Sequence, residues 1–344
     1  MSARQLWFTK PYNVEIQEHS LPLLQANEVL VRSKYSAISA GTEMLVYRGQ
    51  IPADMPLDTS LAALQDRQAE YPLQYGYAVT GHIEQVGKNV DPAWAGKPVF
   101  AFQPHASHFI TTLAQVIPLP EDIDPLAAVF LANMETAVNL VQDGHPLLGE
   151  RVVVLGQGIV GLLVSTLLAE FPLDGLYALD RINERRLRAN KAGVTNEYNP
   201  DSATEMHKLQ KELSTGQSGK GADLIYELTG TPETLNLAIE LCGYAGRIVI
   251  GSWYGTKPAN LLLGNNFHRN RIQMISSQVS TIAPELSGRW DTSRRFDLAW
   301  KMIRKLHPEQ LISHHIPFDC AADAYHLLDQ SPEEVLQTVL TYEN

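Results

Sequence analysis

The segment VVVLGQGIVG at residues 152–161 decides the fold of this chain. Its glycines Gly156, Gly158 and Gly161 have the G-x-G-x-x-G spacing and lie between a β-branched run and an apolar, helix-like stretch. A carboxylate, Asp180, follows about 20 residues later, at the end of the next strand-like run, LYALD. This order of strand, glycine turn, helix and acidic residue is typical of a dinucleotide-binding unit.

Each glycine has a separate task in such a turn. Gly156 permits the tight change of direction, Gly158 lets the backbone approach a pyrophosphate, and Gly161 allows the helix to pack on the sheet. The first turn of this helix contains Ile159 and Val160, and its free N–H groups face the phosphates. The alternative is a strand–helix unit whose turn is purely structural.

The strand–helix alternation continues to about residue 280. Strand patterns at residues 222–228 and 247–253 alternate with helix patterns at 182–193 and 232–243. The sequence therefore predicts an α/β fold, a doubly wound parallel sheet with helices on both faces.

The chain before about residue 130 has a different pattern, in which short strand-like runs are separated by Gly and Pro. Such spacing predicts a partly open β-barrel. Residues 51–70 are expected to form a loop and a short helix that shape the substrate pocket. Residues 124–141 are expected to form one helix, capped by Asp124 and with Pro125 at its first position.

Composition limits the possible functions. The 344 residues are 44% hydrophobic, which is enough for two cores, and the net charge of −11 argues against nucleic acid as a main partner. The two cysteines are too few for a disulfide framework, which fits a cytoplasmic protein. No apolar stretch is long enough to span a membrane, and no signal peptide is recognised.

These motifs give the chain a resemblance to the medium-chain dehydrogenase/reductase family, which includes the zinc alcohol dehydrogenases. The resemblance covers nearly the whole chain, including SAGTEMLVYRG at residues 39–49, YGYAVTG at 75–81 and ADLIYELTG at 222–230. Within the family, the chain is most similar to bacteriochlorophyllide dehydrogenase-like proteins, which also have a Pro-His pair like that at residues 104 and 105.

The resemblance implies a domain organisation and an activity. We expect a GroES-like catalytic domain at residues 1–134, a Rossmann domain at 135–280 and a return to the catalytic domain at 281–344. Family members transfer a hydride to or from a nicotinamide ring, and we expect the same of this chain with a small-molecule substrate. A bulky or ring-bearing substrate is favoured by the aromatic residues Tyr47, Tyr77, Trp253 and Tyr254.

The zinc ligands of the family are missing here. Ala40 stands at the first cysteine position, and Tyr77 replaces the histidine of the Gly-His-Glu motif. At the third ligand position the chain has Ala132 beside Asn133. Alanine has no donor atom and tyrosine is a poor zinc ligand, so we predict that the protein binds no zinc.

Without a metal, protein groups must polarise the substrate oxygen and move a proton. Thr42 matches the proton-relay hydroxyl of the family, Tyr77 is expected to point toward the substrate, and His105 offers an imidazole. Glu135 is expected to orient one of these groups. The alternative for each is an ordinary packing, capping or surface role, and for Glu43 we favour a structural salt bridge.

The coenzyme prediction depends on Asp180, whose carboxylate accepts from a ribose 2′-OH and repels a 2′-phosphate. This favours NAD over NADP, although Arg181 next to it is able to reach a phosphate. Further coenzyme contacts are predicted at the ends of two later strands: Thr229, Gly230, Gly251 and Ser252.

Three functions remain open at this stage. The first is a zinc-independent, NAD-linked dehydrogenase for an alcohol/carbonyl pair; the second is an NADPH-dependent enoyl or quinone reductase. The third is a non-catalytic nucleotide-binding protein, because fold does not fix function.

The strand pattern at residues 272–278 is expected at a sheet edge, which together with the family resemblance predicts a homodimer.

Overall fold

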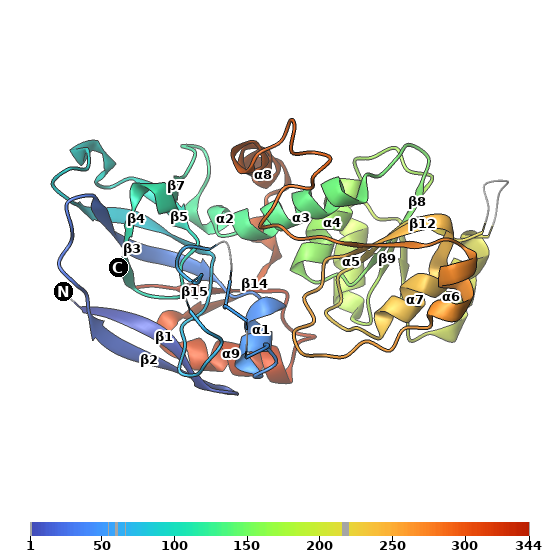
Figure 1. Cartoon of the computed structure of the whole chain (residues 1–344), viewed down its shortest axis with the longest axis horizontal. Helices are drawn as coiled ribbons and strands as arrows, with labels where there is room; N and C mark the ends of the chain where they lie inside the picture. Colours follow the sequence, from blue (N-terminus) through green and yellow to red (C-terminus); the bar gives the residue numbers. More distant parts are fainter. Residues whose placement is uncertain (1, 54, 59–60, 66, 215–219, 344) are drawn as a thin grey trace. The chain divides into compact units, whose positions relative to one another are not determined.

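The computed structural model describes residues 2–53, 55–58, 61–65, 67–214 and 220–343 (Figure 1). Its internal contacts divide the chain into two compact units: unit 1 is Met1–Ala132 with Trp300–Asn344, and unit 2 is Asn133–Ala299. The first boundary lies close to the expected one after residue 134. The second lies within helix α8 (Thr292–Leu306), later than the expected boundary after residue 280.

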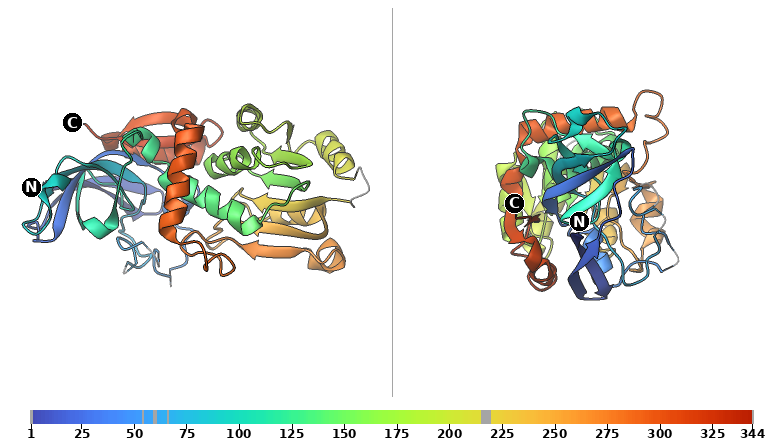
Figure 2. Two further views of the ribbon diagram at one scale, coloured as in Figure 1. Left: turned by 90° about the horizontal axis from the view of Figure 1, so that it is seen from above. Right: turned by 90° about the vertical axis from the view of Figure 1, so that its left-hand side faces the viewer.

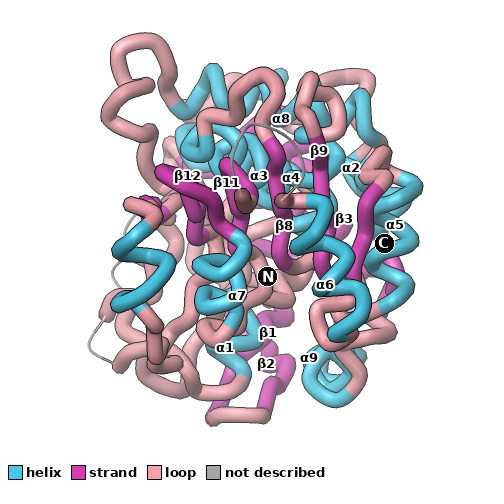
Figure 3. Tube along the Cα trace, turned by 90° about the vertical axis from the view of Figure 1, so that its right-hand side faces the viewer, coloured by secondary structure: helices cyan, strands magenta, loops and turns pink. Residues whose placement is uncertain are grey.

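Unit 2 contains, in its described part, a parallel sheet with the strand order β10-β9-β8-β11-β12-β13. The strands are β8 (Arg151–Leu155), β9 (Gly175–Leu179), β10 (Asn196–Tyr198), β11 (Ala222–Glu227), β12 (Cys242–Ile250) and β13 (Gln273–Ser276). Figure 3 shows β12, β11, β8 and β9 side by side. The order is that of a Rossmann fold, so the predicted fold class is confirmed.

The sheet order changes direction at β8. From β8 the chain moves through α4 (Ile159–Leu168) to β9 and through α5 (Asn183–Lys191) to β10. It then returns through α6 (Ala203–Glu212) to β11, on the other side of β8, and continues through α7 (Thr234–Leu241) to β12. Because such crossovers are right-handed, α4 and α5 cover one face of the sheet and α7 the other.

The central strand of this sheet, β8, is apolar because it is buried. Val152, Val153 and Val154 of β8 have no exposed surface, because β8 pairs with β9 on one side and β11 on the other. Parallel strands that are covered on both faces are apolar along their whole length. Strand β10 and helix α6 were not predicted; both are short, and α6 is largely polar.

Unit 1 contains a sheet with the order β14-β15-β3-β4-β5-β7, in which β6 also pairs with β3. A separate antiparallel ribbon is formed by β1 and β2. The strands are β1 (Ser2–Lys10), β2 (Asn13–Ser20), β3 (Glu28–Ala37), β4 (Val79–Val86), β5 (Pro98–Ala101), β6 (His108–Thr112), β7 (Val116–Pro118), β14 (Ile312–Pro317) and β15 (Gln337–Thr341). Both chain termini belong to this unit (Figure 2).

Short helices accompany this sheet: α1 (Thr42–Tyr47), α2 (Pro125–Ala128) and α9 (Ala321–Gln330). The helix expected over residues 124–141 is in fact two, because α2 ends at Ala128 and α3 (Leu131–Gly144) follows it. The predicted start is confirmed: the Asp124 carboxylate accepts from the Leu126 N–H at 2.7 Å, and Pro125 is the first helical residue.

The segment 51–70 belongs to the core of unit 1. Ile51, Leu57, Leu64 and Ala69 are buried in the apolar cluster that also includes Tyr325 of α9. Within the described residues 61–65, the predicted short helix is a turn closed by the Gln65 N–H on the Leu61 carbonyl. Positions 54, 59, 60 and 66 lie outside the described residues.

The described part of the chain has no helix that is both long and apolar enough to cross a membrane. Both cysteines are free thiols; Cys242 is buried and Cys320 is exposed.

Candidate functional site

The glycine turn of unit 2 has the geometry that its sequence predicts. Gly156 has a φ of +89°, and a Cβ at this position would lie 2.7 Å from the Leu228 carbonyl oxygen. A Cβ on Gly161 would lie 1.9 Å from the Gly156 oxygen. Only glycine therefore fits at these two positions.

The space above the turn is open. A Cβ on Gly158 would meet no heavy atom within 4 Å, and Gly158 precedes the first residue of α4 without a side-chain cap. The N–H groups of Ile159 and Val160 thus lie in a first helical turn that has no side-chain acceptor of its own. Such a turn is suited to binding an anion such as a pyrophosphate.

Asp180 lies against this turn. It follows β9, where its Oδ2 accepts from the Gln157 N–H at 2.7 Å and its Oδ1 accepts from the Ile182 N–H at 2.8 Å. The neighbouring Arg181 instead pairs with Asp201 at 2.7 Å, where both side chains are exposed. The carboxylate is therefore held in place by the backbone next to the glycine turn.

Four predicted coenzyme contacts follow β11 and β12, which are adjacent strands. The Gly230 N–H donates to the Ser252 hydroxyl at 2.8 Å, so the two loops are joined directly. The Thr229 N–H donates to Glu227 at 2.9 Å, and the Gly251 N–H donates to the Glu227 carbonyl at 3.1 Å. Glu227 was not predicted; the available signal was a single acidic residue at the end of an apolar strand.

In unit 1, the two hydroxyl residues singled out from the sequence lie together. The Tyr77 phenol donates to the Ser39 hydroxyl at 2.5 Å and lies 3.5 Å from the Thr42 hydroxyl. Burial raises the pKa of Tyr77, so the phenol stays protonated at neutral pH. Ser39 was not predicted as part of this group, although it lies within the SAGTE segment.

His105 is placed behind this hydroxyl group. Its side chain has no exposed surface, with Nδ1 2.7 Å from the Ser36 hydroxyl and Nε2 2.9 Å from a Glu43 carboxylate oxygen. The other Glu43 oxygen accepts from the Ser39 N–H at 2.8 Å. His105 is thus linked to Ser39 through the Glu43 carboxylate, which contacts both residues.

Two further contacts complete this buried cluster. The Tyr325 phenol also donates to Glu43, and the Tyr342 phenol shares a hydrogen bond of 2.8 Å with Ser36. Gly76 has a φ of +119°, and a Cβ there would lie 2.7 Å from the His105 ring. Glycine before Tyr77 is therefore required for His105 to occupy this position.

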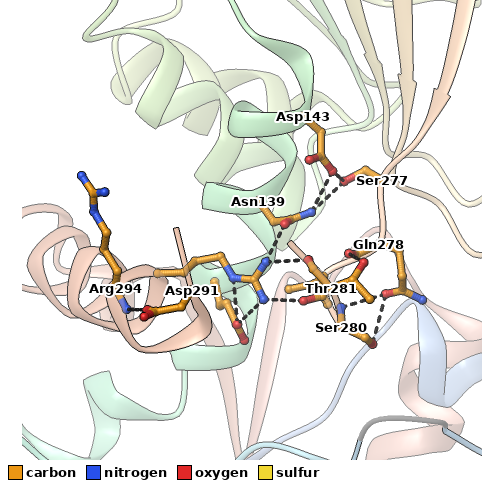
Figure 4. A network of polar contacts seen from close by, with 11 residues as sticks. Asn139, Asp143, Ser277, Gln278, Ser280, Thr281, Asp291 and Arg294 are labelled. Atoms are coloured by element: carbon orange, nitrogen blue, oxygen red, sulfur yellow. Dashed lines mark hydrogen bonds and ion pairs between the residues drawn. The ribbon is translucent and has the colours of Figure 1, made fainter. Parts of the chain in front are cut away.

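Glu135 belongs to unit 2. Its carboxylate accepts from the Arg295 guanidinium at 2.8 and 3.0 Å, and burial raises its pKa to about 7 against the lowering effect of Arg295. Arg295 also donates to Asn139 at 2.7 Å and to the Thr281 carbonyl at 3.0 Å. Figure 4 shows this network, which joins α3 and α8 to the segment after β13.

Comparisons with known proteins agree with this architecture. Residues 160–295 match the family model described as zinc-binding dehydrogenase. The chain is 24% identical to D-guloside 3-dehydrogenase of Escherichia coli (strain K12) over 353 residues, which cover 98% of this chain and 100% of that protein. It is 25% identical to the starvation-sensing protein RspB of the same organism, covering 98% and 99%.

Solved structures show the same fold. The RspB dehydrogenase of E. coli in complex with NADH has a TM-score of 0.78 and 21% identity, covering 99% of both chains. Galactitol-1-phosphate dehydrogenase of E. coli has a TM-score of 0.77 and 19% identity, covering 98% of this chain and 99% of that one. Residues 160–295 thus match a zinc-binding dehydrogenase model, and over nearly its whole length the chain is similar to named dehydrogenases, which supports an enzyme. Its nearer likeness to bacteriochlorophyllide dehydrogenase-like proteins stays a prediction.

The described residues contain no group of three or more His, Cys, Asp and Glu side chains placed to hold a metal ion. At the positions where the family resemblance predicts zinc ligands, Ala40 and Ala132 offer no donor atom, and the neutral Tyr77 phenol donates to Ser39. These residues do not fit the zinc of the family.

Proposed function

We propose that this protein is an NAD(H)-dependent oxidoreductase that interconverts an alcohol and a carbonyl compound without zinc. The coarser part, an oxidoreductase of the medium-chain family, follows from its relatives. The observation that carries the finer part is the Asp180 carboxylate, fixed by the Gln157 N–H beside an open glycine turn.

The coenzyme proposal follows from charge and space. Two backbone N–H groups fix the Asp180 carboxylate, which leaves lone pairs on both oxygens to accept from ribose hydroxyls. A 2′-phosphate at the same place would meet a negative charge, and Arg181 is engaged by Asp201. A nicotinamide dinucleotide bound here supplies or accepts the hydride.

The proton chemistry is assigned to the hydroxyl group of unit 1. We assign to Tyr77 the hydrogen bond to the substrate oxygen, which its phenol makes by exchanging the Ser39 hydroxyl for the substrate as acceptor, and to Thr42 the relay of the proton. His105 and Glu43 act behind them, because Glu43 holds the Ser39 backbone and the Ser39 hydroxyl accepts from Tyr77. Glu135 is left out of this scheme, since its carboxylate is engaged by Arg295.

Zinc independence rests on the donor set. Zinc binds thiolate, imidazole or carboxylate groups, and a phenol of raised pKa that donates to Ser39 is none of these. Polarisation of the substrate oxygen is therefore assigned to hydrogen-bond donors.

Two measurements test the proposal. The first compares the affinities of the purified protein for NADH and NADPH by fluorescence titration, and NADH is expected to bind at least tenfold more tightly, about 1.4 kcal/mol. A clear NADPH preference would favour an enoyl or quinone reductase, and no affinity for either coenzyme would contradict the proposal.

The second measurement follows coenzyme reduction with a panel of secondary alcohols. Glycosides and sugar alcohols come first in the panel, because the named relatives include D-guloside 3-dehydrogenase and galactitol 1-phosphate 5-dehydrogenase. Turnover is expected to persist after exhaustive chelation of metals. Activity that chelation abolishes and zinc restores would contradict zinc independence.

We also propose a homodimer formed through β13. This strand is at the end of the sheet order and pairs with β12 alone within the described residues. A free edge invites pairing with a second copy across a two-fold axis. Light scattering combined with size-exclusion chromatography is expected to give twice the chain mass of 38.2 kDa, and a monomeric mass would refute the dimer.

A further inference from the structure

A buried carboxylate at the end of β11 accepts hydrogen bonds from several segments of unit 2. Glu227 is the last residue of β11 and has no exposed surface. An unpaired carboxylate is costly to bury, so its position requires donors from its surroundings. The described residues supply these donors from two loops and one helix.

Four groups donate to Glu227. One oxygen accepts from the Thr229 N–H at 2.9 Å, from the Thr229 hydroxyl, and from the Thr234 hydroxyl at 2.9 Å. The other oxygen accepts from the Tyr254 phenol at 2.5 Å. Thr234 begins α7, and Tyr254 lies in the loop after β12, so a single side chain connects both with the loop after its own strand.

The same two loops are joined a second time at the Gly230 peptide. Its N–H donates to the Ser252 hydroxyl at 2.8 Å, and its carbonyl accepts from the Lys257 ammonium at 2.9 Å. Both backbone polar groups of Gly230 are thus held by the loop after β12. Glu227 and Gly230 together fix the relative placement of the two loops.

The loop after β11 also contacts the glycine turn. The space beside Gly156 is closed by the Leu228 carbonyl and the Thr229 Cα, which would lie 2.7 and 3.0 Å from a Cβ. The Leu228 N–H donates to the Leu155 carbonyl at 2.8 Å, directly before the turn. A shift of the loop after β11 would therefore displace the glycine turn.

We propose that Glu227 is a positioning residue for dinucleotide binding, which sets the loops after β11 and β12 and supports the glycine turn through Leu228. This inference rests on the proposed function. Glu227 lies beneath the two loops and affects dinucleotide binding through their positions. Tyr254 and Thr234 contribute to this positioning through their hydrogen bonds to Glu227.

Tyr254 provides a way to weaken this device without emptying the Glu227 site. Burial, followed by the nearby Glu227 charge, raises the pKa of Tyr254, so its phenol donates over the whole working pH range. Tyr254→Phe removes this one hydrogen bond and keeps the ring, and Glu227→Gln keeps the shape and removes the charge. Glu227→Ala is avoided, because it would leave several buried donors unpaired.

The test measures NADH affinity by fluorescence and the hydrogen exchange of peptides that cover residues 228–235 and 250–258. In Tyr254→Phe and Glu227→Gln, we expect a roughly three- to tenfold weaker affinity and faster exchange in both peptides, because hydrogen bonds to charged groups are the stronger ones. Exchange in β8 and β9 is expected to stay unchanged.

A matched control is available on the same strand. Tyr226 precedes Glu227, is fully buried, and its hydroxyl has no hydrogen-bond partner among the described residues. Tyr226→Phe is therefore expected to leave both readouts at wild-type values. An equal loss in Tyr226→Phe would overturn the inference, because it would show a general disturbance of β11.

The outcomes separate this inference from the proposed function. If wild-type protein binds NADH and the Tyr254 and Glu227 variants bind it equally well, with unchanged loop exchange, the inference fails alone. If wild-type protein binds neither NADH nor NADPH, the proposed function fails and the inference with it.

Discussion

Tyr77 is the residue on which the proposed proton chemistry depends. Tyr77→Phe removes the phenol that donates to Ser39 and lies near Thr42, while the ring stays in place. We expect kcat to fall by about 100-fold with little change in NADH affinity, since a positioned proton donor contributes about 10²–10⁴ to the rate. Steady-state kinetics in the reducing direction measures this.

Tyr71→Phe serves as the control for this prediction. The Tyr71 phenol also donates a part-buried hydrogen bond, which goes to the Val46 carbonyl and not to Ser39 or Thr42. Its kcat is expected to stay near the wild-type value. An equal loss of kcat in both variants would contradict a specific role of Tyr77 in proton transfer.

Asp180 determines the coenzyme preference in the proposed function. Asp180→Ala removes the acceptor of two backbone N–H groups and the charge that would oppose a 2′-phosphate. The affinity for NADH is expected to fall about tenfold, and the affinity for NADPH is expected to fall less. The ratio of the two affinities therefore becomes smaller. Fluorescence titrations with both coenzymes give this ratio.

Asp201→Ala distinguishes this effect from a change in Arg181. It frees the Arg181 side chain from its exposed partner and leaves Asp180 intact. NADH affinity should stay the same in this variant. If Asp201→Ala, and not Asp180→Ala, changes the coenzyme ratio, Arg181 is the residue that decides it.

At the scale of elements, α3 and α8 are held together by a buried ion pair whose carboxyl group titrates near neutral pH. The pKa of Glu135 rises from 4.5 to about 7 on burial. Between these values the folded protein keeps a proton that the unfolded chain has lost, so the free energy of unfolding decreases as the pH rises from about 4.5 to 7. Arg295 keeps Asn139 and the Thr281 carbonyl as partners when Glu135 is protonated.

Glu135→Gln removes this titration. The difference in unfolding free energy, wild type minus variant, is expected to be larger at pH 5 than at pH 8, by on the order of 2 kcal/mol. Urea denaturation at several pH values measures it. Glu184→Gln, on the exposed face of α5, is the control. A difference that increases with pH would show that the ion pair with Arg295 dominates.

The sequence predicted elements well where periodicity and glycine spacing were strong. The run VVV and the three glycines indicated one local structure, a strand followed by a glycine turn and a helix. This turn requires glycine, because a Cβ at Gly156 or Gly161 would collide with backbone atoms. Strand β10 escaped prediction because three residues show no period. Helix α6 was overlooked although Met206, Leu209 and Leu213 form an apolar stripe on a largely polar helix. The break between α2 and α3 contains no Gly or Pro, so the sequence contains no signal for it.

The candidate site was predictable only in part, for a related reason. Gly158, Asp180, Thr42 and Tyr77 were proposed from the sequence because each has a fixed place in a motif. Ser39 and Glu227 were missed, since their importance comes from partners distant in the sequence: Tyr77 lies 38 residues from Ser39, and Tyr254 lies 27 residues from Glu227. The role of Glu135 was assigned from sequence proximity to Thr136, but its partner Arg295 is 160 residues away.

On the scale of the whole molecule, each unit has its own apolar core. The core of unit 2 includes Val153, Ile225 and Ile248 of the parallel sheet, and a separate core of unit 1 includes Phe8 and Tyr325. A ligand that binds only the folded state of one unit adds its binding free energy to the stability of that unit. Because the proposed coenzyme contacts all lie in unit 2, NADH should stabilise this unit first.

Hydrogen exchange with and without NADH measures this distribution. At a free NADH concentration of 100 times Kd, the linkage contributes about 2.7 kcal/mol, and the largest protection is expected at residues 153–162, 178–183 and 227–231. The sheet of unit 1 is expected to gain less, and Asp180→Ala should lower the protection at a fixed NADH concentration. Protection that is greatest in unit 1 would contradict the assignment of the coenzyme to the glycine turn, because a ligand protects most strongly the backbone that it contacts.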